Sequence, residues 1–150
     1  MVEKKTVYFE LPGPPNTDEL FKAAKKRADE LGIKDIVIAS STGDTVVKAS
    51  EFFKGFNLVV VSHATGFRGP GTQEMPEDVR KKIISKGAKV LTTGHALSGI
   101  ERGAKAVLTG SFPLELVAQT LRLFGQGTKV AVEITVMAAD AGLIPSDKDI

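Results

Sequence analysis

Short, nearly continuous apolar runs alternate with helix-like stretches along this chain of 150 residues. The runs at 35–39, 58–61 and 89–92 are typical of parallel strands that are covered on both faces. A further short strand is predicted at 6–10. Strand and helix patterns that alternate at this spacing indicate βαβ units. We therefore expect an α/β fold, a three-layer αβα sandwich with a mostly parallel sheet.

Helical periodicity fills the intervals between these runs. Helices with Gly or Pro end signals are expected over 17–31, over 44–54, from Pro76 to a stop at Gly87, and over 113–124. Their predicted inward faces are Leu20, Phe21, Ala24, Ala28 and Leu31; Val47, Ser50 and Phe53; Val79, Ile83 and Ile84; Leu116, Val117, Thr120, Leu121 and Phe124. The segment 129–141 alternates like a strand and also fits a helix, and its length and Ala-rich end favour the helix.

Composition excludes several classes of protein. The chain has no cysteine, which rules out disulfides and thiolate sites and is compatible with the cytoplasm. Its 20 basic and 18 acidic residues give a net charge of only +2, which does not indicate a nucleic-acid or membrane partner. No apolar segment is long enough for a membrane span or has the form of a signal peptide. We expect one cytoplasmic domain over 1–150.

Three loops rich in Gly, Ser and Thr follow the carboxyl ends of the predicted strands, where doubly wound sheets bind ligands. The loop 40–45 opens a helix, so its hydroxyls and N–H groups could hold a phosphate, although ordinary helix capping is the alternative. Asp44 argues against an anion site unless its carboxylate turns away. The other two loops contain His63 and His95, the only histidines of the chain.

Each of these residues also has a structural interpretation. His63 alone would more often be a hydrogen-bonded structural histidine, and Phe67 is as easily a core residue as a stacking platform. Arg102 could bind a phosphate, or could form a surface ion pair with Glu101 or Asp78. Two histidines without paired carboxylates make a poor metal site, so no metal is predicted. No nucleophile–base–acid set is readable from spacing alone, and the catalytic residues stay unknown.

A family resemblance rests on the segments 31–45, 63–67, 73–76, 95–103 and 121–142. In these segments the chain resembles, nearly end to end, a stand-alone and mostly archaeal group of pyruvate kinase α/β-domain-like proteins that has no established reaction. The resemblance implies that 129–141 is a helix. The catalytic barrel of pyruvate kinase has no counterpart here, so pyruvate kinase activity is not implied.

The same resemblance implies a bound flavin mononucleotide (FMN). Its phosphate end would be held by Ser40, Ser41, Thr42, Gly43 and Thr45. The rest would be lined by His63, Thr65, Gly66, Phe67, His95, Ala96, Leu97, Ser98, Gly99 and Arg102. Three residues of the same loops complete the candidate site: Asp44, Thr93 and Gly94.

The family continues beyond the equivalent of Ile150 with an apolar strand, a Gly-rich turn and a final strand. We therefore expect the sheet to lack its last one or two strands and to expose an edge, which favours a homo-oligomer. The leading functional hypothesis is a module that binds a phosphorylated flavin or nucleotide, with FMN first. The alternatives are an FMN-dependent oxidoreductase and a structural or regulatory interaction domain without a ligand.

Overall fold

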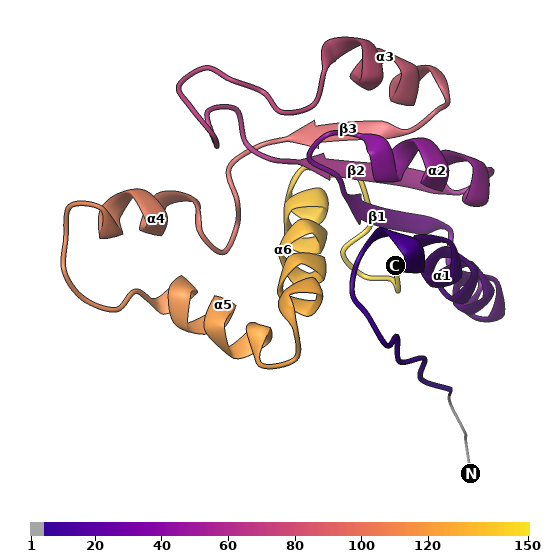
Figure 1. Ribbon diagram of the computed structural model, residues 1–150, viewed down its shortest axis with the longest axis horizontal. Coiled ribbons are helices and arrows are strands. Elements are labelled where there is room, and N and C mark those ends of the chain that lie inside the picture. The colour runs from indigo at the N-terminus through magenta and orange to yellow at the C-terminus, as the bar shows by residue number, and fades with distance from the viewer. Residues whose placement is uncertain (1–4) are drawn as a thin grey trace.

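A three-stranded parallel sheet lies at the centre of the computed structural model, which describes residues 5–150 (Figure 1). Strands β1 (Asp35–Ala39), β2 (Asn57–Ser62) and β3 (Lys89–Thr92) are hydrogen-bonded in the order β1-β2-β3. The register places Val37 opposite Val59, and Val61 opposite Leu91. The three apolar runs at 35–39, 58–61 and 89–92 are thus confirmed as parallel strands.

Helices connect and flank the strands. They are α1 (Thr17–Leu31), which follows the short 3-10 helix η1 (Pro14–Asn16), α2 (Asp44–Phe52), α3 (Glu77–Ser85), α4 (Gly99–Lys105), α5 (Pro113–Arg122) and α6 (Gln126–Asp140). The ambiguous segment 129–141 is helical, as its length and Ala-rich end predicted. Helix α4 forms between β3 and α5, where the sequence pattern predicts no helix. Between residues 5 and 150, no helix is long and apolar enough to cross a membrane.

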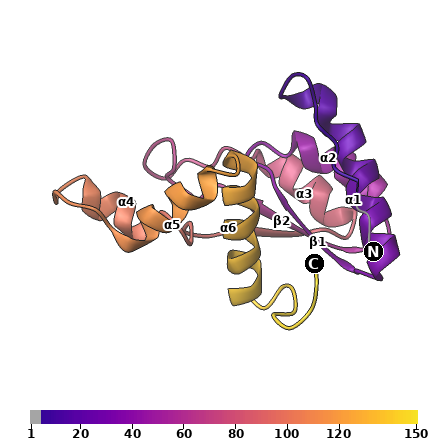
Figure 2. The ribbon, with the colours of Figure 1, turned by 90° about the horizontal axis from the view of Figure 1, so that it is seen from below.

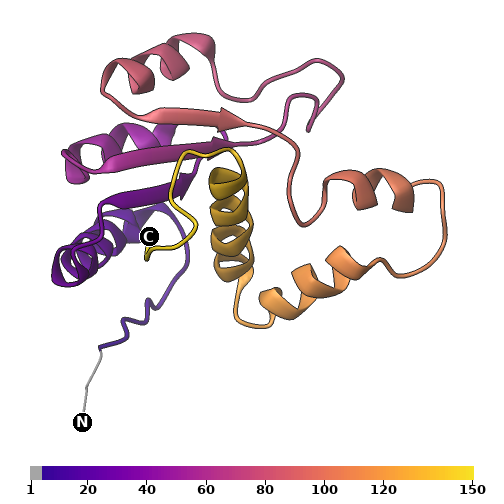
Figure 3. The ribbon, with the colours of Figure 1, turned by 180° about the vertical axis from the view of Figure 1, so that it is seen from behind.

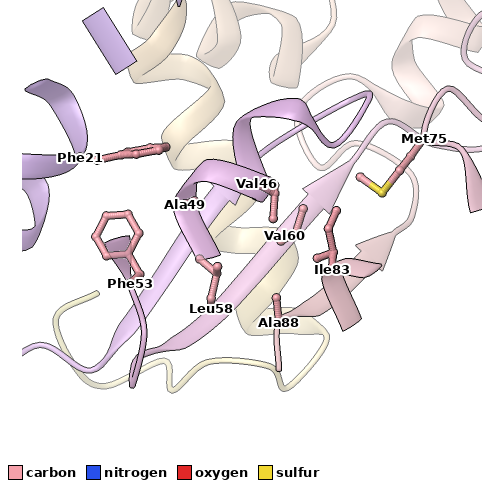
Figure 4. Packing of buried hydrophobic residues seen from close by; sticks show 9 residues of the cluster. All are labelled: Phe21, Val46, Ala49, Phe53, Leu58, Val60, Met75, Ile83 and Ala88. Carbon is pink, nitrogen blue, oxygen red and sulfur yellow. The ribbon is translucent and has the colours of Figure 1, made fainter. Parts of the chain in front are cut away.

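One face of the sheet packs against α1, α2 and α3. Leu58 and Val60 of β2 point into a cluster that these three helices close (Figure 4). Val46 of α2, Val60 of β2 and Ile83 of α3 have no exposed surface. This cluster is the larger part of the core, and it fixes α2 and α3 against the strands that they follow.

The opposite face of the sheet packs against α6 and the segment after it. Because side chains alternate along a strand, Val59 and Val61 point away from the first cluster and contact this second layer. Ala138 packs on Val59, and Met137 packs with Val61. Helices therefore cover both faces, as the view from behind shows (Figure 3), and the predicted αβα sandwich is confirmed.

Helices α4 and α5 extend away from the sheet (Figures 1 and 2). The apolar stripe predicted to face inward on 113–124 is wrong in orientation, because only Ala118 of α5 is buried. Leu123 and Phe124, just after α5, are 82% and 76% exposed. Amphipathic periodicity shows that a helix has an apolar side, but it does not show that a partner element is present to cover that side.

Three other expectations need correction. Residues 6–10 form no strand, and Tyr8 is 89% exposed, because this segment pairs with no strand of the sheet. On α2 the buried residues are Val46 and Ala49, so the helix is rotated by about one position from the predicted face of Val47 and Ser50. The predicted inward residues Leu20, Leu31 and Ile84 are exposed at the margins of their helices.

Candidate functional site

The carboxyl ends of the three strands bring the three Gly-, Ser- and Thr-rich loops together. The backbone N–H of Ser40 donates to the carbonyl of Val61 at 3.0 Å, which ties the first loop to β2. The hydroxyls of Ser62 and Thr92 lie 2.6 Å apart, which ties the second loop to the third. Parallel strands therefore place the predicted site residues at one edge of the sheet, as the sequence indicated.

The first loop turns tightly into α2. The N–H of Gly43 donates a buried hydrogen bond of 3.1 Å to Ser40 Oγ. The Ser40 hydroxyl therefore stabilises the turn of the loop itself. Gly43 has a φ of 98°, and a Cβ on it would collide with Val79 of α3. A glycine is therefore required at this position for both its backbone conformation and its contact with α3.

The N-terminus of α2 presents donors to the solvent. Within residues 5–150, the backbone N–H groups of Thr42, Asp44 and Thr45 have no hydrogen-bond acceptor. The Asp44 carboxylate does not turn away from the loop, since its Oδ2 accepts a hydrogen bond of 2.8 Å from Thr42 Oγ1. The loop thus combines free donors, which favour an anion, with one carboxylate that opposes it.

A cluster of three rings lies beside this loop. His63 stacks on Phe67 with ring centroids 4.1 Å apart, and His95 lies 5.5 Å from His63 and 5.3 Å from Phe67. The guanidinium of Arg102 lies over the Phe67 ring, 4.6 Å from its centroid. Four of the predicted site residues, from the second and third loops and from α4, therefore form one ring-and-cation cluster.

The ion pair considered for Arg102 does not form with Glu101 or Asp78 in the described part of the chain. Glu101 instead accepts hydrogen bonds from the backbone N–H groups of Leu114 and Glu115, at 3.1 and 3.0 Å. It thereby caps the first turn of α5. Arg102 is left to interact with the ring of Phe67.

His63 is held from both sides. Its Nδ1 lies 2.5 Å from Glu74 Oε2, and its Nε2 lies 3.3 Å from Ser41 Oγ. The second oxygen of Glu74 accepts a hydrogen bond of 3.3 Å from Arg68 Nε. The hydrogen bond from His63, assisted by Arg68, holds the pKa of the Glu74 carboxyl below its ordinary value. Glu74 therefore stays a carboxylate down to a lower pH than a free glutamate.

A small pocket of about 70 Å³ lies under the ring cluster, between the strand ends and α6. Its polar wall includes Ser41, His63 and His95, and its apolar wall includes Val61 and Met137. Burial lowers the pKa of His95, and the positive charges of Lys129 and Arg102 act in the same direction while Glu133 opposes them. The neutral form of the His95 ring is therefore favoured.

A buried ion pair on α6 supports the third loop. Lys129 Nζ lies 2.5 Å from Glu133 Oε2, and the two side chains are only 5% and 6% exposed. The other oxygen of Glu133 accepts a 3.0 Å hydrogen bond from the backbone N–H of Leu97. This bond holds the loop between β3 and α4 against α6, so both charged groups are satisfied.

The predicted site residues divide into three groups. Ser41, His63, Phe67, His95 and Arg102 are linked by the contacts above. Ser40, Gly43, Ala96 and Leu97 pack inward and shape their loops, while Ser98 directly precedes α4 and Gly99 begins it. The remaining predicted residues are exposed on the loops around the cluster or at the start of α2: Thr42, Asp44, Thr45, Thr65, Gly66, Thr93 and Gly94.

Sequence reasoning missed Glu74, Lys129 and Glu133 as site residues. Glu74 lies eleven positions after His63 in a Gly-rich loop, a spacing that predicts no contact. The pair on α6 had a readable signal, because opposite charges four residues apart stand within a mainly apolar stretch of the helix. No group of three or more His, Asp or Glu side chains in residues 5–150 is placed to hold a metal ion.

The chain matches a known protein family. The profile of the family described as "Pyruvate kinase, alpha/beta domain" matches residues 18–150. The match includes all three strands, all three loops at their carboxyl ends and the α6 ion pair.

Proposed function

Because this chain belongs to the pyruvate kinase alpha/beta-domain family, we propose that it binds a phosphorylated small molecule at the carboxyl ends of its strands. The observation that carries the proposal is the N-terminus of α2, where the N–H groups of Thr42, Asp44 and Thr45 are free of protein acceptors in residues 5–150. Such groups, at the positive end of a helix dipole, favour a phosphate.

The ring cluster supports a ligand that has a planar ring as well as a phosphate. Phe67, His63 and His95 present aromatic surface next to the α2 N-terminus, and Arg102 adds a cation. FMN has both parts, and it would contribute hydride and electron transfer if it were bound. We therefore propose FMN as the specific ligand and Ser41, Thr42 and Thr45 as the residues for its phosphate.

The size of the pocket restricts how a flavin fits. A pocket of about 70 Å³ is well below the roughly 300–1,000 Å³ that encloses a drug-sized ligand. This pocket would therefore not enclose the tricyclic ring, and the Phe67 ring and the Arg102 guanidinium are the groups that would hold it. The phosphate end matches the donors of α2 directly, whereas the ring end relies on surface stacking.

The first experiment is an absorbance spectrum of the freshly purified protein, with mass spectrometry of what heat denaturation releases. We expect a yellow protein that releases FMN in near-equal amount. If the protein is colourless, and added FMN does not raise its melting temperature, the flavin proposal is wrong.

A second experiment separates phosphate binding from ring binding. FMN and riboflavin differ only in the phosphate, so anisotropy titrations of both flavins isolate its contribution. We expect FMN to bind more tightly, and Asp44→Asn to strengthen FMN binding several-fold without changing riboflavin binding, because it removes a negative charge from the phosphate site. Asp29→Asn on α1 is the matched control. Equal affinity for both flavins would contradict a phosphate site at α2.

A further inference from the structure

Ser41, His63 and Glu74 stand in the spatial order of a nucleophile, a base and an orienting acid. Ser41 Oγ is 3.3 Å from His63 Nε2, and His63 Nδ1 is 2.5 Å from Glu74 Oε2. A carboxylate can only accept a hydrogen bond, so when the ring carries one proton, Nδ1 donates to Glu74 and Nε2 is left to accept the proton of Ser41. This is the arrangement that activates a serine hydroxyl in acyl transfer, where the Ser–His contact is often long before substrate binds.

The acid of this set is held firmly. Gln73, the residue before Glu74, donates from its side-chain amide to the carbonyl of His63 at 3.2 Å. Its amide oxygen accepts the N–H of Met75 at 3.2 Å, and Met75 is buried in the main core cluster. The loop that contains Glu74 is thus anchored at His63 and in the core.

Two further features match the needs of acyl transfer. The N–H of Thr42 follows Ser41 directly and, like those of Asp44 and Thr45, has no acceptor in the described chain. Such donors can stabilise an oxyanion that forms at the carbonyl carbon. The pocket of about 70 Å³ that Ser41 and His63 line has apolar walls from Val61 and Met137. It exceeds the roughly 10–15 Å³ that one water needs, and it suits a short acyl chain.

We propose that Ser41, His63 and Glu74 hydrolyse esters of short-chain carboxylic acids, a reaction beyond the proposed ligand binding that uses Ser41 and the same N–H groups at the start of α2. Ser41 Oγ bonds to the carbonyl carbon and its proton passes to His63 Nε2. The bond to the alcohol oxygen then breaks, and His63 returns the proton to the departing alcohol. Water gives a proton to His63 and its oxygen attacks the acyl carbon; the bond to Ser41 Oγ then breaks, His63 returns the proton to Ser41 Oγ, and the carboxylic acid leaves. Glu74 is a positioning residue, because it acts through His63.

The test uses the full chain with p-nitrophenyl acetate and follows the release of p-nitrophenolate. We expect turnover that Ser41→Ala lowers at least a hundredfold, while Ser50→Ala, on helix α2 that follows the Ser41 loop, leaves it unchanged. p-Nitrophenyl octanoate should be hydrolysed far more slowly than the acetate, because its chain exceeds the pocket. A rate that persists in Ser41→Ala would overturn the proposal, since it would report acylation of histidines or lysines.

Two readouts do not depend on the folding of a serine variant. A fluorophosphonate probe should label the wild-type protein, and peptide mass spectrometry should find the label on Ser41; labelling elsewhere or none overturns the proposal. Glu74→Gln should lower kcat with little change in KM, and Glu74→Asp should recover part of kcat. If kcat falls and KM rises together in both variants, Glu74 has a structural role only. The flavin titrations above decide the phosphate site separately.

Discussion

The buried ion pair on α6 makes the most demanding prediction about stability. Lys129→Met removes the cation and leaves the Glu133 carboxylate, which is only 6% exposed, with the Leu97 N–H as its remaining hydrogen-bond partner. Removing one partner of a buried pair costs about 3–5 kcal/mol, because the other charge stays desolvated. With a urea m-value of about 2 kcal/mol/M, the midpoint of unfolding should fall by about 1.5–2.5 M. Far-UV circular dichroism suits the assay because the chain has no tryptophan.

A matched control is present on α1. Lys26 and Glu30 have the same residue types, order and spacing as Lys129 and Glu133, but Lys26 is 80% exposed. Lys26→Met should therefore change stability by only about 0.5 kcal/mol. The double variant Lys129→Met with Glu133→Leu removes both charges and should recover much of the loss. If Lys129→Met stays within about 1 kcal/mol of the wild type, the burial argument is wrong.

Three further predictions use the same unfolding assay. Ile83→Ala should cost about 2–5 kcal/mol because Ile83 is fully buried, whereas Leu123→Gln should change stability by about 0.5 kcal/mol or less because Leu123 is already exposed. Gly43→Ala should cost at least about 1–3 kcal/mol from its backbone conformation alone, and Gly94→Ala, where φ is not positive and a Cβ meets open space, is its control. Burial lowers the pKa of His95 from its ordinary value of 6.5, so the unfolded chain binds this proton more readily. Stability should therefore fall as the pH drops through 6.5, and His95→Gln should reduce that fall; equal slopes for both proteins would refute the assignment.

The sequence correctly predicted those strands for which it also contains the neighbouring strands that pair with them. Three apolar runs in one chain can pair with each other, so β1, β2 and β3 were predictable. The apolar segment 6–10 has the same local pattern as a strand, yet it pairs with none of the three. The prediction for the apolar stripe of α5 failed for the same reason, since no element within residues 5–150 covers Leu123 or Phe124. Local pattern predicts which residues avoid water, and only topology decides whether they can.

The position of the candidate site at the ends of the strands could be predicted from the sequence, whereas the contacts between its side chains could not. The rule that ligands bind at the carboxyl ends of parallel strands selected the loops that contain Ser41, His63 and His95. It could not select Glu74, because the hydrogen bond to His63 depends on how a Gly-rich loop folds back on its own strand end. Glu133 was also out of reach, since its bond to Leu97 joins positions 36 residues apart.

The proposed phosphate site and the proposed ester-hydrolysis site would share the N–H groups of Thr42, Asp44 and Thr45, so the two proposals constrain each other. A phosphate bears its negative charge permanently, while an ester acquires one at its carbonyl oxygen only during the reaction. Inorganic phosphate should therefore compete with p-nitrophenyl acetate, raising its KM and leaving kcat unchanged. Asp44→Asn should lower the inhibition constant of phosphate, because removal of the Asp44 charge favours a bound phosphate. If hydrolysis depends on Ser41 but phosphate does not inhibit it, the two sites use different N–H donors.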